Sequence, residues 1–506
     1  MMTRREIGIG LATATLLPFP AHAARRFSVR DHGARGDGAT LDTDAVNAAI
    51  EAASAAGGGT VVFPAGRYLC FSIRLKSRVT LLLEKGAVIE AADPTRHPGR
   101  YDLAEEGIDQ LYQDYGHSHW RNSLIWGDGV EDVAILGPGL IHGAGLTRNG
   151  PGARWKAQTG ERPLSMKDMP AKSIDELEPA AVAMRGQGNK AIALRRGRNI
   201  RLSGFAMLKC GHFAILATGT QALTITDLVI DTDRDGIDLD CVKGALVERC
   251  RVNTPNDDAI VVKASYALGE AIPAEDIVIR HCAVSGYDLG TMLDGTRGTT
   301  MRLAPDRDRP TGRIKLGTES NGGYRNVLVE DCTFDHCRGL ALETVDGGIL
   351  ENVTARRLKM RDITTAPIFL RIGDRRRGPA GTGIGAIRGV LIEDVEAVGI
   401  DHRYAASIAG LPGHPAERVT LRNIRLTYDG GGTAADAALA PPEVPAAYPE
   451  PSMFGTLPSW GLFIRHAGDI TIDGLTLATT KPDARPPFRV EDAPGLKVTR
   501  TPLWRG

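Results

Sequence analysis

The chain has 506 residues with 61 basic and 61 acidic side chains, and it contains 60 glycines but only 5% aromatic residues. The balanced charge excludes the basic field of a nucleic-acid-binding protein, and beyond the N-terminus no apolar stretch reaches the roughly 18 residues of a membrane span. Many glycines in a chain of ordinary apolar content favour short strands joined by tight turns over collagen or disorder.

The N-terminus has the layout of an export signal. Arg4 and Arg5 precede an apolar run over residues 8–17, and a small-residue cleavage site ends at Ala23. We therefore predict that residues 1–23 are a secretory signal of the twin-arginine type, with an ordinary signal and a chance arginine pair as the alternative. The mature protein is expected to be periplasmic or secreted.

The next element predicted is an amphipathic helix. It covers residues 43–56 and is followed by a glycine run at 57–59, which is a typical helix stop. A solenoid needs a cap at its end, so we expect this helix to close the N-terminal end of the fold described next.

A strand motif recurs along most of the chain. The clearest copies are 198–205, 222–228, 245–250, 276–282, 326–332, 389–395, 418–424 and 469–475. Each copy alternates apolar and polar residues, and Ile200, Leu223 and Leu246 are spaced 23 residues apart. A β-sandwich does not keep one motif over so many copies. We predict an all-β fold, a right-handed parallel β-helix (a single-stranded solenoid), over one domain covering residues 24–506.

Three long stretches interrupt this rhythm, near residues 94–128, 146–188 and 429–460. Long insertions in a regular scaffold are usually functional walls or disordered loops. Seven cysteines are present, and Cys250, Cys282 and Cys332 occupy one place in the repeat. We expect these three to be stacked core thiols rather than parts of a disulfide framework.

Two acidic clusters fall in consecutive coils, at residues 231–240 and 256–258. Asp235 and Asp257 are 22 residues apart, one coil period, so we expect them to lie side by side. Adjacent carboxylates push their proton affinities apart. One can then stay protonated while another is ionised, which is what glycoside hydrolysis requires.

Some of these acids also fit a structural role or a calcium site. For Asp231 and Asp240 we expect a structural role, because aspartates at turns commonly bond the backbone. The Asp-x-Asp-x-Asp-Gly pattern also resembles a calcium loop, but Val242 stands where such a loop requires its last glutamate.

These motifs resemble those of glycoside hydrolase family 28, the polygalacturonase-like pectin hydrolases. The family's Asn-Thr-Asp-Gly-Ile-Asp motif corresponds to residues 233–238, which places its catalytic aspartate on Asp235. The family's aspartate pair corresponds to Asp257 and Asp258, and its Arg-Ile-Lys motif is intact at 313–315. The similarity covers nearly the whole mature chain and implies a pectin hydrolase.

One family motif is missing. No copy of Gly-His-Gly exists, and the nearest equivalent is the stretch 285–290, whereas His281 lies inside the strand repeat and is expected to be structural. The resemblance still places Lys263, at the end of the strand after the aspartate pair, and Tyr287 among the substrate-binding residues. What replaces the missing histidine is left open, and the altered motifs favour relatives active on rhamnogalacturonan or other branched pectin.

The resemblance implies an inverting mechanism. Asp257 would protonate the glycosidic oxygen while Asp235 and Asp258 activate a water. Arg313 and Lys315 would hold the carboxylate of a galacturonic acid unit on the outward face of an alternating strand. The alternative for these two cations is a structural ion pair with the neighbouring acids.

We expect no metal or organic cofactor, a pectic polysaccharide or oligosaccharide as substrate, and a monomer that attacks chain ends because the insertions wall the cleft. Two rivals remain, a pectate lyase-like enzyme and a non-catalytic carbohydrate-binding β-helix. The sequence leaves open whether the bond cut joins galacturonic acid to galacturonic acid or to rhamnose.

Overall fold

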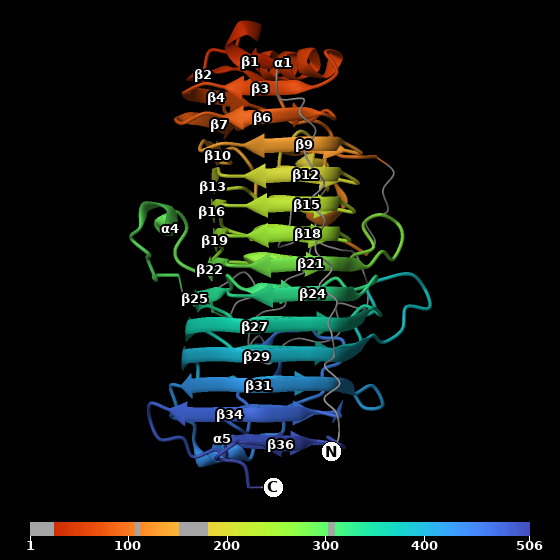
Figure 1. The fold of residues 1–506 in the computed structure, drawn as a ribbon, viewed down its shortest axis with the longest axis vertical. Helices are drawn as coiled ribbons and strands as arrows, with labels where there is room; N and C mark the ends of the chain where they lie inside the picture. Colours follow the sequence, from red (N-terminus) through yellow and green to blue (C-terminus); the bar gives the residue numbers. More distant parts are fainter. Residues whose placement is uncertain (1–24, 107–111, 151–180, 302–308, 506) are drawn as a thin grey trace, which may run out of the picture.

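The computed structural model describes residues 25–106, 112–150, 181–301 and 309–505, so the predicted signal lies outside it. Figure 1 shows a right-handed parallel β-helix, with two long sheets that each receive a strand from successive coils. The predicted fold class is confirmed. Within the described residues no helix is long and apolar enough to cross a membrane.

Twelve strands form one sheet, which carries the site described below: β5 (Ile73–Arg74), β8 (Ser123–Asp128), β11 (Lys190–Arg195), β14 (Phe213–Thr218), β17 (Asp235–Asp240), β20 (Ile260–Lys263), β23 (Ile314–Leu316), β26 (Leu340–Thr344), β28 (Ile368–Ile372), β30 (Ala406–Ala409), β32 (Leu462–Arg465) and β35 (Phe488–Glu491).

The other sheet has 24 strands and bends around the opposite side of the core: β1 (Arg26–Ser28), β2 (Asp37–Leu41), β3 (Gly59–Phe63), β4 (Gly66–Cys70), β6 (Val79–Leu83), β7 (Ala87–Ala91), β9 (Glu131–Leu136), β10 (Leu140–His142), β12 (Arg198–Ser203), β13 (Ala206–Leu208), β15 (Gln221–Thr226), β16 (Val229–Asp231), β18 (Lys243–Glu248), β19 (Arg251–Asn253), β21 (Ala274–Arg280), β22 (Ala283–Ser285), β24 (Tyr324–Glu330), β25 (Thr333–Cys337), β27 (Ile349–Ile363), β29 (Ala386–Ile400), β31 (Ala416–Tyr428), β33 (Ala467–Gly468), β34 (Thr471–Thr479) and β36 (Lys497–Thr499).

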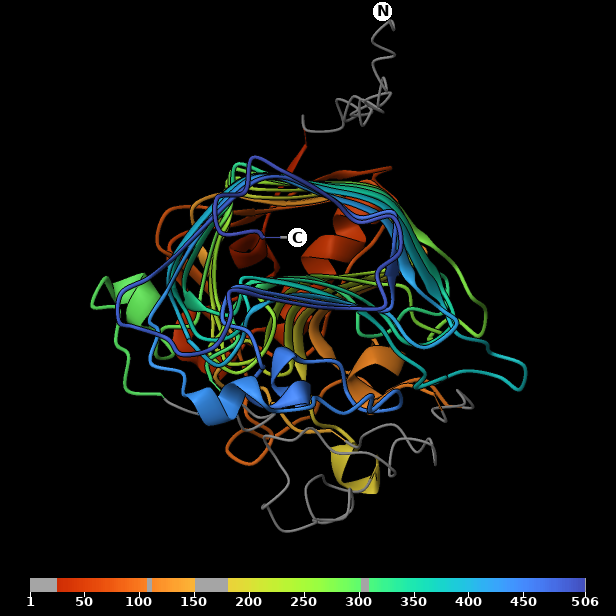
Figure 2. The ribbon, with the colours of Figure 1, turned by 90° about the horizontal axis from the view of Figure 1, so that it is seen from below.

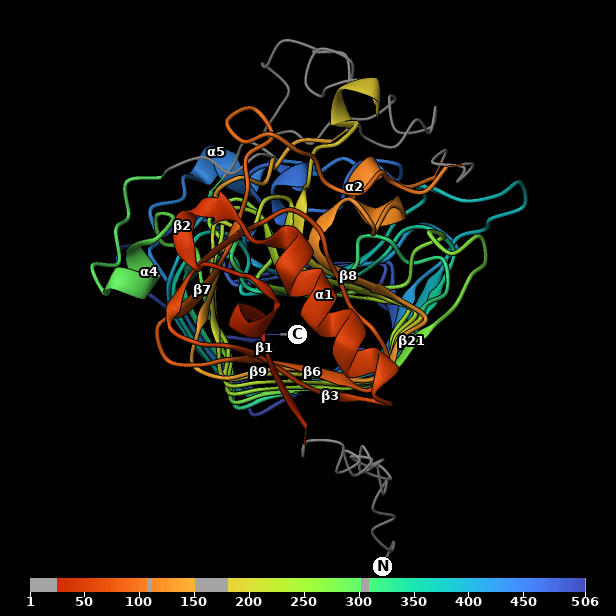
Figure 3. The same cartoon turned by 90° about the horizontal axis from the view of Figure 1, so that it is seen from above.

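The described helices are α1 (Thr43–Ala55), α2 (Tyr115–Ser118), α4 (Thr291–Asp294) and α5 (Ala434–Ala437), with 3-10 turns η2 (Val29–His32), η5 (Ala181–Met184) and η6 (Pro451–Phe454). As predicted, α1 lies across the N-terminal end of the solenoid (Figure 3), and its apolar side is buried. It therefore covers coil edges that would otherwise face water.

Alternation builds the core, because every second side chain of a strand points inward. The register corrects one predicted repeat: Ile200 pairs with Leu223 as expected, but Leu223 pairs with Ala245 and not with Leu246. This coil has 22 residues instead of 23, and the one-residue shift turns Leu246 away from the core cluster.

The interrupting segments gather on one side of the solenoid. Figures 2 and 3 show α2, η5, α5 and η6 beside the outer face of the 12-stranded sheet. The first interruption is shorter than predicted, because β8 already begins at Ser123, and most of the second, 151–180, lies outside the described residues.

The three aligned cysteines are buried free thiols, as expected. Cys250, Cys282 and Cys332 follow three neighbouring strands of the larger sheet and interact in sequence along the stack.

Candidate active site

Three neighbouring strands of the 12-stranded sheet position the predicted site. β17, β20 and β23 are paired in parallel, with Ile237, Ile260 and Ile314 in one register column facing the core. The residues that alternate with the inward-facing apolar ones along each strand face outward, toward the interrupting segments. This alternation brings the polar residues of three sequence motifs onto one face.

The stacking of the acids differs from the prediction by one residue. In the strand register Asp258, and not Asp257, is stacked on Asp235, and the Asp258 backbone N–H donates to Asp235 Oδ1 at 3.2 Å. The offset between β17 and β20 is 23 residues. A side chain at Gly236 would collide with the carbonyl oxygen of Ala259, which explains the glycine after Asp235.

The structure nevertheless brings Asp235, Asp257 and Asp258 together. One oxygen from each lies within 4.8 Å of the others. Asp235 and Asp258 are each 3% exposed, whereas the Asp257 side chain is 23% exposed. The cluster is thus nearly enclosed, and Asp257 is its member that meets solvent.

Each aspartate has its own cationic partner. Arg313 Nε donates to Asp258 Oδ1 at 2.8 Å, and Lys315 Nζ lies 3.6 Å from Asp258 Oδ2. Arg234, which sequence reasoning did not single out, donates from Nε and Nη2 to Asp257 Oδ2 at 3.1 and 3.0 Å.

These partners separate the proton affinities of the buried pair. Burial, followed by the charge of Asp257, raises the pKa of Asp235 well above its usual range. Burial alone would also raise the pKa of Asp258, but Lys315 and Arg313 lower it below the ordinary value. Asp235 therefore tends to keep a proton where Asp258 is ionised, as expected for neighbouring carboxylates with different roles.

Lys263, predicted to bind substrate, lies at the centre of a buried network. Its Nζ lies 3.3 Å from Asp235, 2.8 Å from Asp238 and 3.8 Å from Glu319. Burial lowers the pKa of Lys263, but Asp235 and Asp238 outweigh it and hold the pKa well above normal. Its substrate-binding role stays a prediction.

A histidine that sequence reasoning missed joins this network. His117, in α2, places Nε2 at 2.5 Å from Lys263 Nζ and 3.2 Å from Asp238, while Nδ1 lies 2.7 Å from Asp114. Burial lowers the pKa of His117, but Asp114 raises it to about 10. It comes from the first interruption, where no repeat spacing relates it to the aspartates.

Arg313 and Lys315 point to the same side, as predicted, but both are 1% exposed. Arg313 donates from Nη1 and Nη2 to the two carboxylate oxygens of Glu450 at 2.8 and 2.5 Å, in addition to its bond with Asp258. Arg338 Nη1 also contacts Glu450, at 2.7 Å. The expectation of solvent-facing cations is therefore corrected: the segment 429–460 buries them.

Lys315 is enclosed in a similar way. Its Nζ lies 3.3 Å from Glu343, 3.3 Å from the Tyr448 hydroxyl and 5.0 Å from the centre of the Tyr448 ring. Burial raises the pKa of Glu343 to about 7 although Lys315 opposes the shift. Glu343 and Glu450 are further site residues that the sequence motifs did not indicate.

Tyr287 is not joined to the three aspartates by any contact described in the structure. Its hydroxyl donates to Asp335 at 2.6 Å, and its ring stacks on His336 with centroids 5.7 Å apart. The two acids expected to be structural are bonded to neighbouring coils and loops of the protein. Asp231 accepts backbone N–H groups at the start of α4, and Asp240 accepts from Ser265.

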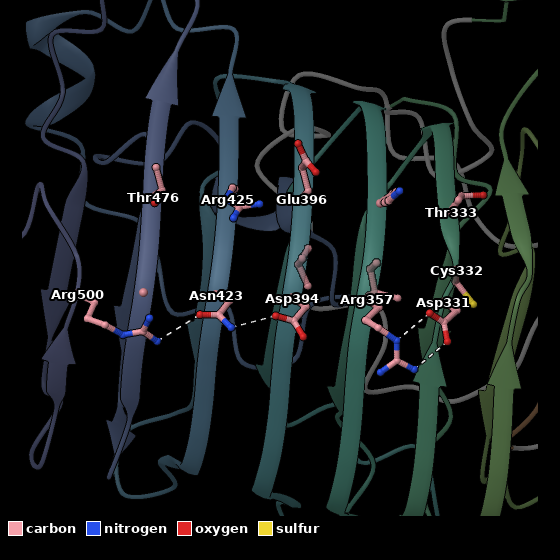
Figure 4. A pocket seen from close by; sticks show the side chains of 14 residues that line it. Asp331, Cys332, Thr333, Arg357, Asp394, Glu396, Asn423, Arg425, Thr476 and Arg500 are labelled. Atoms are coloured by element: carbon pink, nitrogen blue, oxygen red, sulfur yellow. Dashed lines mark hydrogen bonds and ion pairs between the residues drawn. The ribbon is translucent and has the colours of Figure 1, made fainter.

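A groove lined by described residues lies elsewhere. It has a volume of about 830 Å³ and crosses the larger sheet, where Figure 4 shows charged side chains that pair from coil to coil, such as Arg357 with Asp331 and Asn423 with Asp394. These pairs satisfy one another along the stack, and the groove contains none of the three clustered aspartates.

The chain is similar to several known proteins. Residues 26–93 match the family model "Rhamnogalacturonase A/epimerase, pectate lyase-like". A "Probable polygalacturonase" of Vitis vinifera is 24% identical over 433 residues, which cover 80% of this chain and 74% of the relative.

Two solved structures share the fold. The hyperthermoactive exopolygalacturonase of Thermotoga maritima has a TM-score of 0.63 at 20% identity, covering 90% of this chain and 92% of its own. The family 28 exopolygalacturonase of Yersinia enterocolitica has a TM-score of 0.63 at 18% identity, covering 93% and 78%. The predicted resemblance to the polygalacturonase-like proteins of glycoside hydrolase family 28 is confirmed, and it indicates a glycoside hydrolase.

Proposed function

We propose that the protein hydrolyses α-linked galacturonic-acid-containing pectic polysaccharide or oligosaccharide, and that it acts from chain ends. The observation that carries this proposal is the trio of Asp235, Asp257 and Asp258, whose oxygens lie within 4.8 Å of one another in different electrostatic environments. An acid and a base in contact with one glycosidic bond are the minimum equipment for its hydrolysis.

The roles follow from the resemblance and from the partners of each acid. Asp257 is the trio's member at the solvent-facing side and protonates the leaving oxygen. Asp235 and Asp258 orient the attacking water, and Asp258, kept ionised by Lys315 and Arg313, accepts its proton. Buried Lys263 contacts both Asp235 and His117 of α2, and so positions Asp235 within the trio.

The inverting outcome is proposed from the resemblance alone. Inverting pairs are usually about 6.5–9.5 Å apart and retaining pairs about 5–5.5 Å. The closest oxygens here are nearer than either range. Proton NMR of the first product formed decides this point, because an inverting enzyme acting on an α-linkage releases a β-anomer.

Action at chain ends is supported by enclosure. Glu450, from the segment 429–460, and His117, from the interruption before β8, contact the buried network from two separate insertions. A cleft that is covered from two directions accommodates the end of a polysaccharide better than its middle.

Export of the mature protein to the periplasm or medium, action as a monomer and independence from a metal or nucleic acid belong to the same proposal. His117, Asp235 and Asp238 are close enough together to hold a metal ion. The ammonium nitrogen of Lys263 lies among them, 2.5 Å from His117, 3.3 Å from Asp235 and 2.8 Å from Asp238. Lys263 thus supplies the positive charge that a cation would bring.

The test is product analysis with polygalacturonate and with rhamnogalacturonan oligosaccharides, using Asp258→Asn as the inactive control. Hydrolysis of either substrate to saturated sugars supports the proposal and identifies the linkage. Ultraviolet-absorbing unsaturated products would show a lyase, and binding without turnover by the native protein would show a carbohydrate-binding β-helix.

A further inference from the structure

The inference concerns the cation that meets the substrate's carboxylate, and it rests on the proposed function. The two cations expected in that role, Arg313 and Lys315, are each 1% exposed. Arg313 already gives Nε to Asp258 and both Nη atoms to Glu450. A substrate carboxylate would have to replace Glu450, an ion-paired carboxylate of the protein itself.

Arg234 is placed differently. Its side chain is 24% exposed, beside Asp257 at 23%, so this pair forms the accessible side of the trio. It occupies the middle of the stretch Asp233-Arg234-Asp235, where the resembled family has a neutral residue. The substitution puts a guanidinium directly next to the acid expected to protonate the scissile bond.

The hydrogen bonds of Arg234 leave one edge of its guanidinium available. Both bonds to Asp257 use the edge formed by Nε and Nη2. A guanidinium has five N–H groups, and the edge formed by Nη1 and Nη2 carries a second parallel pair. Apart from a 3.4 Å contact between Nη1 and His212 Nδ1, no described protein group is recorded against that edge.

We propose that Arg234 binds the carboxylate of the sugar acid next to the scissile bond through its Nη1–Nη2 edge, and that it sets the preference for acidic over neutral sugars. Parallel N–H groups match the two oxygens of a carboxylate. Asp257 occupies the other edge, so binding of the uronate and presentation of the acid are coupled through one side chain.

The experiment measures binding of galacturonate and of galactose, which differs by lacking the carboxylate, to the full-length protein by titration calorimetry. Arg234→Gln is expected to raise the Kd for galacturonate by at least about tenfold, equivalent to roughly 1.4 kcal/mol, and to leave the Kd for galactose unchanged. Arg234→Lys should fall between, because it keeps the charge but loses the planar fork.

The matched control is Arg148→Gln. Arg148 pairs with Asp233 at 2.7 Å in the same region but does not contact Asp257, so this variant should bind galacturonate like the native protein. Melting curves of all variants show whether the fold is retained.

The inference is overturned if Arg234→Gln binds galacturonate as tightly as the native protein, if it loses both sugars equally, or if the native protein does not prefer galacturonate. Hydrolysis of pectic substrates by the native protein is measured separately. If the native protein hydrolyses pectic substrates but gives any of these binding results, only the role of Arg234 is refuted. If it hydrolyses none of them, the proposed function is refuted.

Discussion

The three aspartates of the site carry the same functional group, and their partners make them different. Asp258 has two cations within 3.6 Å, and Asp257 has Arg234. Among the described residues, Asp235 is ion-paired with Lys263 alone, at 3.3 Å, and Lys263 is shared with other acids. Burial penalises the charge on each buried group unless a partner compensates. The arrangement therefore assigns proton-holding and proton-accepting tendencies before any substrate binds.

The first prediction concerns the proton donor. Asp257→Asn should lower kcat by about 10²–10⁴-fold, the usual contribution of general acid catalysis, because the amide cannot donate a proton to the leaving oxygen. The melting temperature should change little, since the Asp257 side chain is 23% exposed. Steady-state kinetics and thermal melting check both expectations.

Asp233→Asn is the control, because Asp233 lies in the corresponding turn of the preceding coil and pairs with Arg148 and Asn256 instead of the trio. Near-native turnover by Asp257→Asn, or an equal loss in the control, would show that Asp257 is not the donor. Asp235, whose pKa is raised, would then be the next candidate.

The second prediction concerns pH and stability at Asp235. Its pKa is raised in the folded protein, while an unfolded aspartate has a pKa of about 3.9. The unfolded chain therefore releases this proton first as the pH rises. The associated stability is present below about pH 4 and is lost as the pH rises toward the folded pKa.

Asp235→Asn removes this titration, so its melting temperature should decline less between about pH 4 and pH 7 than that of the native protein. Melting at a series of pH values measures the difference. A steeper decline in the variant would contradict the raised pKa. Activity should fall at every pH, because an amide cannot replace the carboxyl group that orients the attacking water.

At the scale of elements, the site is assembled by strands and completed by insertions. The strands could be predicted because alternation and coil spacing relate the acidic clusters at 231–240 and 256–258 to one face. His117 and Glu450 could not, since the segments that carry them have no repeat, and their sequence separation from β17 conveys nothing about distance. Contacts across 137 residues, as between Arg313 and Glu450, depend on tertiary packing.

The third prediction tests the attachment of the segment 429–460. Glu450→Gln leaves Arg313 and Arg338, each 1% exposed, without their shared carboxylate. Removing one partner of a buried ion pair typically costs about 3–5 kcal/mol, so the free energy of unfolding should fall by that order. Denaturant titration measures it.

The comparison is Glu443→Gln, in the same segment. Glu443 pairs with Arg465 and His466, but its side chain is 38% exposed. Water can solvate this carboxylate, and Arg465 keeps its hydrogen bonds to the carbonyls of Pro441 and Pro442, so this variant should lose much less stability than Glu450→Gln. Similar losses in the two variants would show that Glu450 does not anchor the segment.

At the scale of the whole molecule, the repeat predicted the architecture and the N-terminal cap but not the register of every coil. The copy containing Leu246 was misplaced by one residue because Ala245 and Leu246 are both apolar, so alternation alone does not choose between them. The same limit applies to Asp257 and Asp258, two adjacent acids of which only one can stack on Asp235. Hydrogen-bond register settles such choices.

The last prediction follows from where the insertions gather. α2, η5, α5 and η6 lie along one face of the solenoid, over the sheet that holds the trio (Figures 2 and 3). A polysaccharide passing along an open sheet could be cut anywhere, but a site with Asp235 and Asp258 each 3% exposed under two insertions admits the end of a polysaccharide more readily. We expect monomer or dimer products from the first minutes of digestion.

Viscosity and reducing ends, followed together during digestion of polygalacturonate, separate the two modes of attack. Attack at chain ends releases reducing sugar while the viscosity falls slowly, because the long chains shorten one end unit at a time. Attack within chains lowers viscosity steeply at the same number of bonds cut and leaves a ladder of long oligomers. That second pattern would show that the insertions leave the cleft open at both ends. If the viscosity falls more steeply with Glu450→Gln than with Glu443→Gln, the segment 429–460 is the part of the protein that prevents attack within polysaccharide chains.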